Sequence, residues 1–349
     1  MTTTIKLTQF AKGAGCGCKI SPAVLANILA NSRVESPINT NLLVGNSSND
    51  DAAVYNLGNG SALIVTADFF MPIVDDAFTF GQVAAANSLS DVYAMGGKPI
   101  TAIALLGWPI DKLSAEVAAQ VMDGAKQVCN QAGIVISGGH TIDAPEPFFG
   151  LSVNGIANLE HIKQNNTAQD GDVILLSKPI GVGILATAQK RGILAPEHQP
   201  VLVNLLTQLN SFGELLGKES AVHAMTDVTG FGLLGHLVEM SEGSGLTATI
   251  NYAAIPKLQA ALDYVKQSIV PDATYRNWNA YSDKVNIAPT VDAMEAFMLL
   301  PDPQTNGGLL ISVSKNRVDE LINLAHAHQT ELHVIGSFGA SGAKAIEVI

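Results

Sequence analysis

The segment MTDVTGFGLLGH, residues 225–236, decides the fold class, because it reads as a short strand, a glycine-rich turn and the start of a helix. The strand closes on Asp227, and residues 230–235 fit the dinucleotide-binding pattern G-x-G-x-x-G. A dinucleotide fold is therefore one alternative, and close helix packing explains Gly235 equally well. Against the dinucleotide, residues 249–254, about 20 positions further on, offer no acidic side chain for a ribose. Asp227 would repel a bare pyrophosphate, but a bridging metal ion removes that objection, so the segment favours metal–phosphate binding.

Strand and helix patterns alternate along the rest of the chain, which predicts an α/β fold. Helices are predicted after Ser21 and at residues 80–95, 114–132 and 181–190, and strands at 62–65, 100–106, 134–137, 148–157, 173–176 and 309–313. A polar stretch at 159–172 marks a domain boundary. We therefore expect a mobile loop at 1–20, an N-terminal domain at 21–160 and a C-terminal domain at 161–349.

The composition indicates a soluble, globular protein of about two domains. Of its 349 residues, 47% are hydrophobic, 31 are acidic and 19 are basic, which gives a formal charge of −12. This charge disfavours nucleic acid and anionic membranes as partners, and no signal peptide or membrane-spanning segment is expected. Three cysteines indicate a reducing cytoplasm. A polyanionic substrate would need divalent cations to bind so acidic a protein.

Carboxylates at the ends of predicted elements are the main sign of chemistry, and they are Asp50, Asp51, Asp68, Asp91 and Asp227. Any one of them is explained by a turn or a helix cap. Asp91 is different, because it lies in a small, apolar helix surface with Asn87 one turn earlier on the same face. An uncompensated charge there would be costly. Hard oxygen ligands from several segments suit Mg²⁺ shared with substrate phosphates.

The loop GAGCGCK, residues 13–19, carries two thiols on a permissive backbone. Lys19 would favour a thiolate nearby, so Cys16 or Cys18 is a candidate nucleophile or carrier of a soft atom. Half of a soft-metal site and a redox pair are the alternatives. Cys129 falls inside a predicted helix and is expected in the core.

Two more glycine-containing segments are less specific by themselves. Gly138 to Thr141 follows a predicted strand, where it either offers backbone N–H groups to an anion or simply makes a turn. His140 in this segment is explained equally well as a partly buried histidine or as a ligand. The segment DPQTNGG, residues 302–308, is by composition only a polar turn that leads into a strand.

Taken in order, these segments resemble selenophosphate synthetase (selenide, water dikinase), and the resemblance covers nearly the whole chain. The matching segments are GAGCGCK at 13–19, NDDAAV at 49–54, TADFFMPIVDD at 66–76, SDVYAMGGKP at 90–99, GGHTIDAPEP at 138–147, MTDVTGFGLLGH at 225–236 and DPQTNGG at 302–308. The resemblance implies the reaction ATP + selenide + water → selenophosphate + AMP + phosphate. The product would donate selenium for selenocysteine and selenouridine synthesis.

The resemblance also implies a role for individual residues. Cys16 and Lys19 match the catalytic positions, and Asp51, Asp91 and Asp227 match the Mg²⁺ ligands. The positions that match ATP contacts are Lys19, Ser48, Asn49, Asp50, Asp68, Asp91, Gly139, His140 and Thr141. In the last segment the family commonly has Ser where this chain has Asn306, a replacement that keeps a hydrogen-bonding side chain.

For the fold, the resemblance implies two α/β domains with mixed sheets, of the type shared with aminoimidazole ribonucleotide synthetase, behind an N-terminal glycine-rich mobile loop. It implies a cytoplasmic homodimer joined by a barrel-like sheet interface, with ATP and selenide as substrates, Mg²⁺ as cofactor and room for a selenium-delivery protein. Thiamine-phosphate kinase and hydrogenase-maturation dehydratase are alternatives of the same fold, but they should lack the CGCK loop. A non-catalytic nucleotide-binding regulator or a selenium carrier should lack Lys19 or one of the aspartates.

Overall fold

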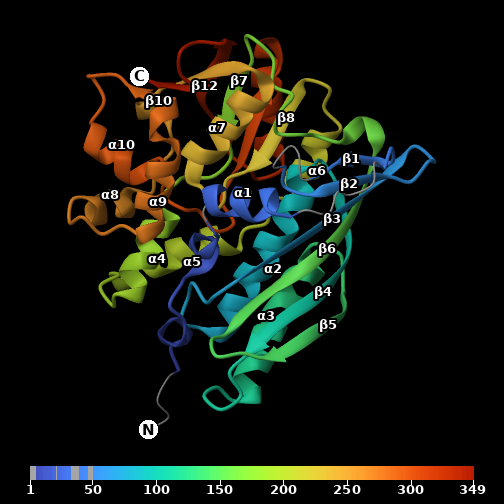
Figure 1. Cartoon of the computed structure of the whole chain (residues 1–349), viewed down its shortest axis with the longest axis vertical. Helices are drawn as coiled ribbons and strands as arrows, with labels where there is room; N and C mark the ends of the chain where they lie inside the picture. The colour runs from blue at the N-terminus through green and yellow to red at the C-terminus, as the bar shows by residue number, and fades with distance from the viewer. Residues whose placement is uncertain (1–4, 21, 33–38, 46–49) are drawn as a thin grey trace.

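The computed structural model of the chain describes residues 5–20, 22–32, 39–45 and 50–349. Within these residues the chain forms two mixed sheets with helices packed on them, as the α/β prediction requires. In Figure 1 the sheet of the N-terminal half lies in the lower part of the view and the sheet of the C-terminal half at the top. No helix in this described part of the chain is long and apolar enough to span a bilayer.

The N-terminal half contributes a six-stranded sheet within the described residues. Its strands lie in the order β1 (Leu42–Val44), β2 (Ala53–Asn56), β3 (Ser61–Phe70), β6 (Phe148–Asn158), β4 (Lys98–Trp108) and β5 (Ile136–Asp143). Neighbouring strands are antiparallel except β4 and β5, which run parallel. Helix α2 (Ala77–Ala94) packs on β3, β6 and β4, and α3 (Ala115–Gln131) packs against α2 (Figure 1).

The C-terminal half contributes a seven-stranded sheet within the described residues. The order of its strands is β10 (Val285–Ile287), β13 (Ile346–Val348), β9 (Leu246–Ile250), β12 (His333–Ala340), β7 (Val173–Leu176), β11 (Leu309–Val313) and β8 (Val222–Asp227). Strand β13 runs parallel to β10 and β9, and the other neighbours are antiparallel. The helices of this half are α4 (Val182–Lys190), α5 (Gln199–Thr207), α6 (Phe212–Gly217), α7 (Gly232–Ser244), α8 (Gln259–Val265), α9 (Asp272–Tyr281), α10 (Ala293–Leu299) and α11 (Val318–Ala327).

Three short elements precede the first sheet. They are the 3-10 turns η1 (Leu7–Phe10) and η2 (Gly15–Cys18) and the helix α1 (Pro22–Ala30). The glycine-rich loop, which we expected to have no fixed element, therefore contains a 3-10 turn, and Cys16 within it is only 1% exposed. Mobility of this loop stays a prediction.

Most of the predicted elements are confirmed, but the turn at Gly138 is wrong. The strand that we expected to end at Ser137 continues to Asp143 as β5. A Cβ on Gly139 would lie 2.4 Å from the Ala104 carbonyl oxygen of β4, so glycine permits the close approach of these two strands. The glycines therefore belong to the sheet and do not make a turn.

Helix α2 is the most deeply buried helix of the N-terminal half, because every residue from Val83 to Ala94 is buried. Two glycines bring α2 into backbone contact with α3. A Cβ on Gly81 would lie 1.9 Å from the Val121 carbonyl oxygen, and a Cβ on Gly124 would lie 1.9 Å from the Phe78 carbonyl oxygen. No carbon atom fits at either point unless the two helices separate.

We expect Gly81→Ala to lower the free energy of unfolding by about 1 kcal/mol, because an overpacking cost of roughly 1–3 kcal/mol exceeds the helix-propensity gain of about 1 kcal/mol. Urea denaturation measures this difference. The control is Gly339→Ala in β12, where an added Cβ meets no atom within 4 Å. The control should change stability by less than about 0.5 kcal/mol. Equal stability of the two variants would contradict the packing argument.

Candidate active site

A cavity of about 590 Å³ between the two sheets is lined by carboxylates. Its acidic residues are Asp50, Asp51, Asp68, Asp91, Asp227 and Glu239, and its one lysine is Lys19. They come from the segment before β2, from β3, α2, β8 and α7, and from the end of η2. We call this space the carboxylate cavity. Every described aspartate that the sequence proposed for ATP or Mg²⁺ is thus brought to one place.

Asp51 and Asp91 are each held by a threonine hydroxyl. Thr226 Oγ1 donates to Asp51 Oδ1 at 2.8 Å, and Thr66 Oγ1 donates to Asp91 Oδ2 at 2.5 Å. The second oxygen of Asp51, Oδ2, is buried and has no hydrogen-bond partner among the residues that the structure describes. Burial and neighbouring carboxylates raise the pKa of both side chains well above the ordinary value of an aspartate.

Asp227 is positioned by α2 across the boundary between the two halves. Ser90 Oγ donates to Asp227 Oδ2, and Asn210 Nδ2 donates to Ser90 Oγ at 2.7 Å. Burial raises the pKa of Asp227 to about 6, and burial likewise raises the pKa of Asp50 to about 6. Four carboxylates therefore share a desolvated space in which their negative charges disfavour one another.

These residues fit a divalent cation. Among the described residues, no three His, Cys, Asp or Glu side chains are already arranged as a metal cluster. Mg²⁺ does not require such a cluster, because it keeps several waters and binds through one or two carboxylates together with substrate phosphates. The unpartnered Asp51 Oδ2 and the raised pKa values of its neighbours are what a hard cation would relieve.

Lys19 connects the carboxylate cavity to a second cavity of about 390 Å³, which Cys16 and Cys18 also line. We call this second space the thiol cavity. Lys19 Nζ lies 3.7 Å from Asp68 Oδ1, and both residues line both cavities. Asp68 raises the pKa of Lys19, so the ammonium group stays charged. One cation thus faces both the carboxylate cavity and the thiol cavity.

Cys16 is a buried, protonated thiol in this position. Its Sγ donates to Asn87 Oδ1 at 3.1 Å. Burial raises the pKa of the Cys16 thiol, and Asp68 adds to this, whereas Lys19 lowers it by less. The expected activation of the thiolate by Lys19 is therefore outweighed by desolvation. Burial also raises the pKa of Cys18, and Cys129 is buried in the core as predicted.

The segment 302–308, which we interpreted only as a turn, holds the thiol loop in place. Cys16 N donates to Thr305 Oγ1 at 3.0 Å, and Asn306 N donates to Asn87 Oδ1 at 2.8 Å. Asn306 adopts φ 50°, and its Nδ2 donates to the carbonyls of Leu206 and Gln208. The sequence carried no signal for these contacts, since the partners lie more than 70 positions apart. The glycine pair that follows Asn306 indicates a turn but does not identify these partners.

Five predicted ATP positions lie either outside the described residues or away from this cavity. Ser48 and Asn49 lie outside the described residues. Gly139, His140 and Thr141 are exposed residues of β5, an edge strand of the sheet, which excludes the alternative of a partly buried His140 and leaves its role as a ligand a prediction. Three strand intervals separate β5 from β3, which is about 14 Å.

Comparison with known proteins identifies the broad protein family to which the chain belongs. The family model described as AIR synthase related protein, N-terminal domain, matches residues 49–157, and the corresponding C-terminal domain model matches residues 169–349. Thiamine-monophosphate kinase from Stenotrophomonas maltophilia K279a superposes with a TM-score of 0.65 at 21% identity, over 93% of this chain and 94% of that one. Hydrogenase maturation protein HypE in complex with ATP superposes with a TM-score of 0.63 at 17% identity, over 99% and 95%. The chain is an AIR synthase related protein, which confirms the fold that the resemblance implied.

Relatives of higher sequence identity identify the particular family within this broader one. The selenide, water dikinase of Aeromonas hydrophila is 53% identical over 350 residues, which span 99% of each chain. The selenide, water dikinase of Photorhabdus laumondii is 50% identical over 350 residues, which span 100% of this chain and 99% of that one. The chain belongs to the selenide, water dikinase family, and the resemblance in its motifs is confirmed.

We expect His236, which also lines the carboxylate cavity, to destabilise the protein in acid. Its Nε2 accepts a hydrogen bond from Thr229 N at 3.0 Å, and burial lowers its pKa to about 3. The unfolded chain takes up a proton near pH 6.5 and the folded chain does not, so stability present above pH 6.5 is lost as the pH falls towards 3.

The measurement is urea denaturation of the wild type and His236→Gln at pH 7 and pH 5. The difference in stability should shift by on the order of 1–2 kcal/mol in favour of the variant at pH 5. Comparing the two proteins at each pH cancels the other titrating groups. A difference that stays constant with pH would show that His236 can be protonated in the folded protein.

Proposed function

We propose that the chain makes selenophosphate from ATP, selenide and water, with AMP and phosphate as the other products. The observation that carries this proposal is the wall formed by Lys19 and Asp68, on which the carboxylate cavity and the thiol cavity meet. A triphosphate on one side and a soft nucleophile on the other can meet there. The product would serve as the selenium donor for selenocysteine and selenouridine synthesis.

In this proposal Asp51, Asp91 and Asp227 hold Mg²⁺, which when bound neutralises charge on the triphosphate. Asp50 and Asp68 lie beside the nucleotide. The hydroxyls that donate to these carboxylates keep them oriented before substrate arrives, so that little reorganisation is needed at the moment of transfer.

Lys19 and Cys16 serve the selenium side. The ammonium of Lys19 stabilises anionic selenium or phosphate oxygens, and its bond to Asp68 keeps it on the shared wall. Cys16 holds the selenium nucleophile. Because the thiol is buried and protonated here, we propose that the loop moves to expose it and then closes again to exclude water from the first transfer.

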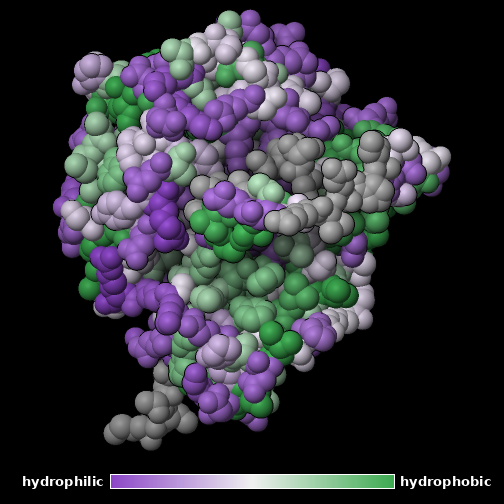
Figure 2. Space-filling view, viewed as in Figure 1, coloured by the Kyte–Doolittle hydropathy of each residue, from purple (hydrophilic) through white to green (hydrophobic). Residues whose placement is uncertain are grey.

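We propose that two copies of the chain pair through the open face of the N-terminal sheet. This is the face opposite α2, and it presents Val65, Phe69, Ile103 and Ile156, which are 37–54% exposed. Figure 2 shows apolar side chains gathered over the region where Figure 1 draws β3 and β6. In such a homodimer, the exposed Gly139, His140 and Thr141 of β5 would serve a site formed together with the other copy.

Ile103→Asp should shift sedimentation of the protein from twice the chain mass towards a single chain, because a charge would be buried in the pairing face. The control is Ile193→Asp, since Ile193 is similarly exposed (47%, against 42% for Ile103) but belongs to the other half. A wild-type protein that sediments as a single chain would refute the homodimer.

The same proposal places the protein in the cytoplasm, where its cysteines stay reduced. All three cysteines are free in the structure, and none forms a disulfide. In this proposal, selenide enters the thiol cavity either as the free anion or by transfer from a selenium-delivery protein.

Phosphorus NMR of ATP and Mg²⁺, with and without selenide, tests the reaction. The wild type should form selenophosphate and AMP together, and Cys16→Ser should lose the selenide-dependent product while remaining folded, because oxygen replaces the soft atom. Cys129→Ser is the control, since Cys129 lies in the core away from both cavities. Formation of ADP alone would indicate an ordinary kinase, and full activity of Cys16→Ser would remove that thiol from the mechanism.

Asp227→Asn should weaken the apparent affinity for Mg²⁺ at least about tenfold, because it removes a charged ligand while keeping the shape of the side chain. Nucleotide turnover titrated with Mg²⁺ measures this. Asp123→Asn is the control, because Asp123 lies on the exposed side of α3, where its ion pair within the described part of the chain is with Lys126. Turnover of Asp227→Asn that matches the wild type at limiting Mg²⁺ would remove Asp227 from the ligand set.

A further inference from the structure

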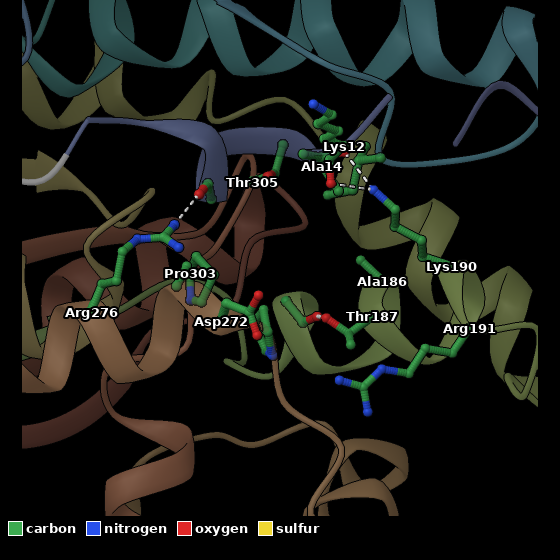
Figure 3. A pocket seen from close by; sticks show the side chains of 16 residues that line it. Lys12, Ala14, Ala186, Thr187, Lys190, Arg191, Asp272, Arg276, Pro303 and Thr305 are labelled. Carbon is green, nitrogen blue, oxygen red and sulfur yellow. Dashed lines mark hydrogen bonds between the residues drawn. The ribbon is translucent and has the colours of Figure 1, made fainter. Parts of the chain in front are cut away.

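A third cavity, of about 340 Å³, lies behind the glycine loop (Figure 3). Gly13, Ala14 and Gly17 of the loop line it, whereas Gly15 and Cys16 line the thiol cavity. The loop therefore separates the two spaces. Helix α4 and the start of α9 form the other walls. We call this space the basic cavity.

The basic cavity has the opposite charge to the carboxylate cavity. Among the described residues that line it, the cations are Lys12, Lys190, Arg191 and Arg276, and the only carboxylate is that of Asp272. The carboxylate cavity has six carboxylates and one lysine. In a chain of formal charge −12, a space lined mainly by cations departs from the average of the protein and attracts anions.

Lys190 supplies charge but no free donor. Its Nζ donates to the carbonyl oxygens of Ala11, Lys12 and Gly13 at 2.9, 2.8 and 2.8 Å, which uses all three hydrogens of an ammonium group. Figure 3 shows this side chain reaching up to the loop. Lys190 therefore anchors the loop, and direct contact with a ligand has to come from other residues.

The two arginines keep donors for a ligand. Arg276 Nη2 donates to Gly17 O at 2.7 Å. Arg191 Nη2 donates a long, weak hydrogen bond to Val270 O at 3.4 Å. A guanidinium group has five N–H donors in a planar fork, so most of them remain for an anion. This fork matches the paired oxygens of a phosphate-type anion better than it matches a single soft atom such as selenide.

The size of the basic cavity agrees with a small oxyanion. About 340 Å³ is roughly ten times the ~30 Å³ share of one water, which holds a tetrahedral oxyanion with its hydration. The helix α9 begins at this cavity with Asp272 in its first turn, and this carboxylate offsets the positive potential of the helix end, so the attraction for an anion comes from the four cationic side chains.

We propose that the basic cavity is a binding site for a phosphate-type dianion, separate from the site of the nucleotide. Which dianion it takes rests on the proposed function, whose products include orthophosphate and selenophosphate. A reaction that makes two such anions beside six carboxylates has to remove them, and the cationic side of the loop attracts what the acidic side repels. Arg276 holds Gly17 as well as facing the cavity, so binding is coupled to the position of the loop.

The test is isothermal titration of the full chain, free of nucleotide and metal, with orthophosphate and separately with thiophosphate as a stable analogue of selenophosphate. We expect saturable binding of at least one anion with a Kd of about 1 mM or lower at low ionic strength. The tighter anion identifies the product that the site takes. Omitting Mg²⁺ prevents phosphate from binding through the carboxylate cavity.

Arg191→Gln should weaken binding about tenfold, because one charge-assisted contact is lost. Arg276→Gln should weaken it at least as much. Lys126→Gln on the exposed side of α3 is the control and should bind as the wild type does. Absence of saturable binding, or equal affinity of Arg191→Gln and the wild type, would overturn the proposal. Because no turnover is measured, this result is independent of whether selenophosphate is formed.

Discussion

The burial of α2 is the constraint on which the site depends. Asn87, Ser90 and Asp91 are polar, yet each is buried, so each has to find a partner inside the protein. The partners come from different parts of the chain: Asn87 meets Cys16 and Asp68, Ser90 meets Asp227, and Asp91 meets Thr66. The hydrogen bonds required by the buried polar side chains of α2 thus bring the N-terminal loop, the first sheet and the second sheet to one point.

Close backbone packing makes this possible. Gly213 of α6 approaches the Tyr93 carbonyl of α2, where an added Cβ would lie at 2.3 Å, and Gly217 approaches Gly96 in the same way, at 2.5 Å. Side chains at these points would push the second half away from α2 and separate Asp91 from Asp227. The gathered carboxylates are unfavourable by themselves, as their raised pKa values indicate. The fold therefore holds the charges together by packing elsewhere, which leaves the site ready for a cation.

The parts of the site that could be predicted are those that depend on local periodicity. The spacing of Asn87 and Asp91 on one helix face, and the strand that closes on Asp227, follow from patterns a few residues long. Two kinds of feature could not be predicted. The continuation of β5 through Gly139 depends on its neighbour β4, and the role of Thr305 depends on a contact with Cys16, 289 positions away. The burial of Cys16 could not be predicted for the same reason as the role of Thr305. The neighbouring glycines suggest a flexible backbone, and only the contacts with distant segments show that the thiol is buried.

The loop that carries Cys16 is held by neutral side chains on one side and by cationic side chains on the other. On one side, Asn87 accepts a hydrogen bond from the thiol and Thr305 accepts one from the Cys16 backbone N–H. On the other side, the cations Lys190 and Arg276 hold loop carbonyls. Burial keeps the thiol protonated, and the contact made by the exposed Arg276 costs little to rearrange, because exposed cations exchange partners readily. Movement of the loop should therefore begin at the basic side. An anion that binds there would compete for Arg276 and so change how firmly the thiol is buried.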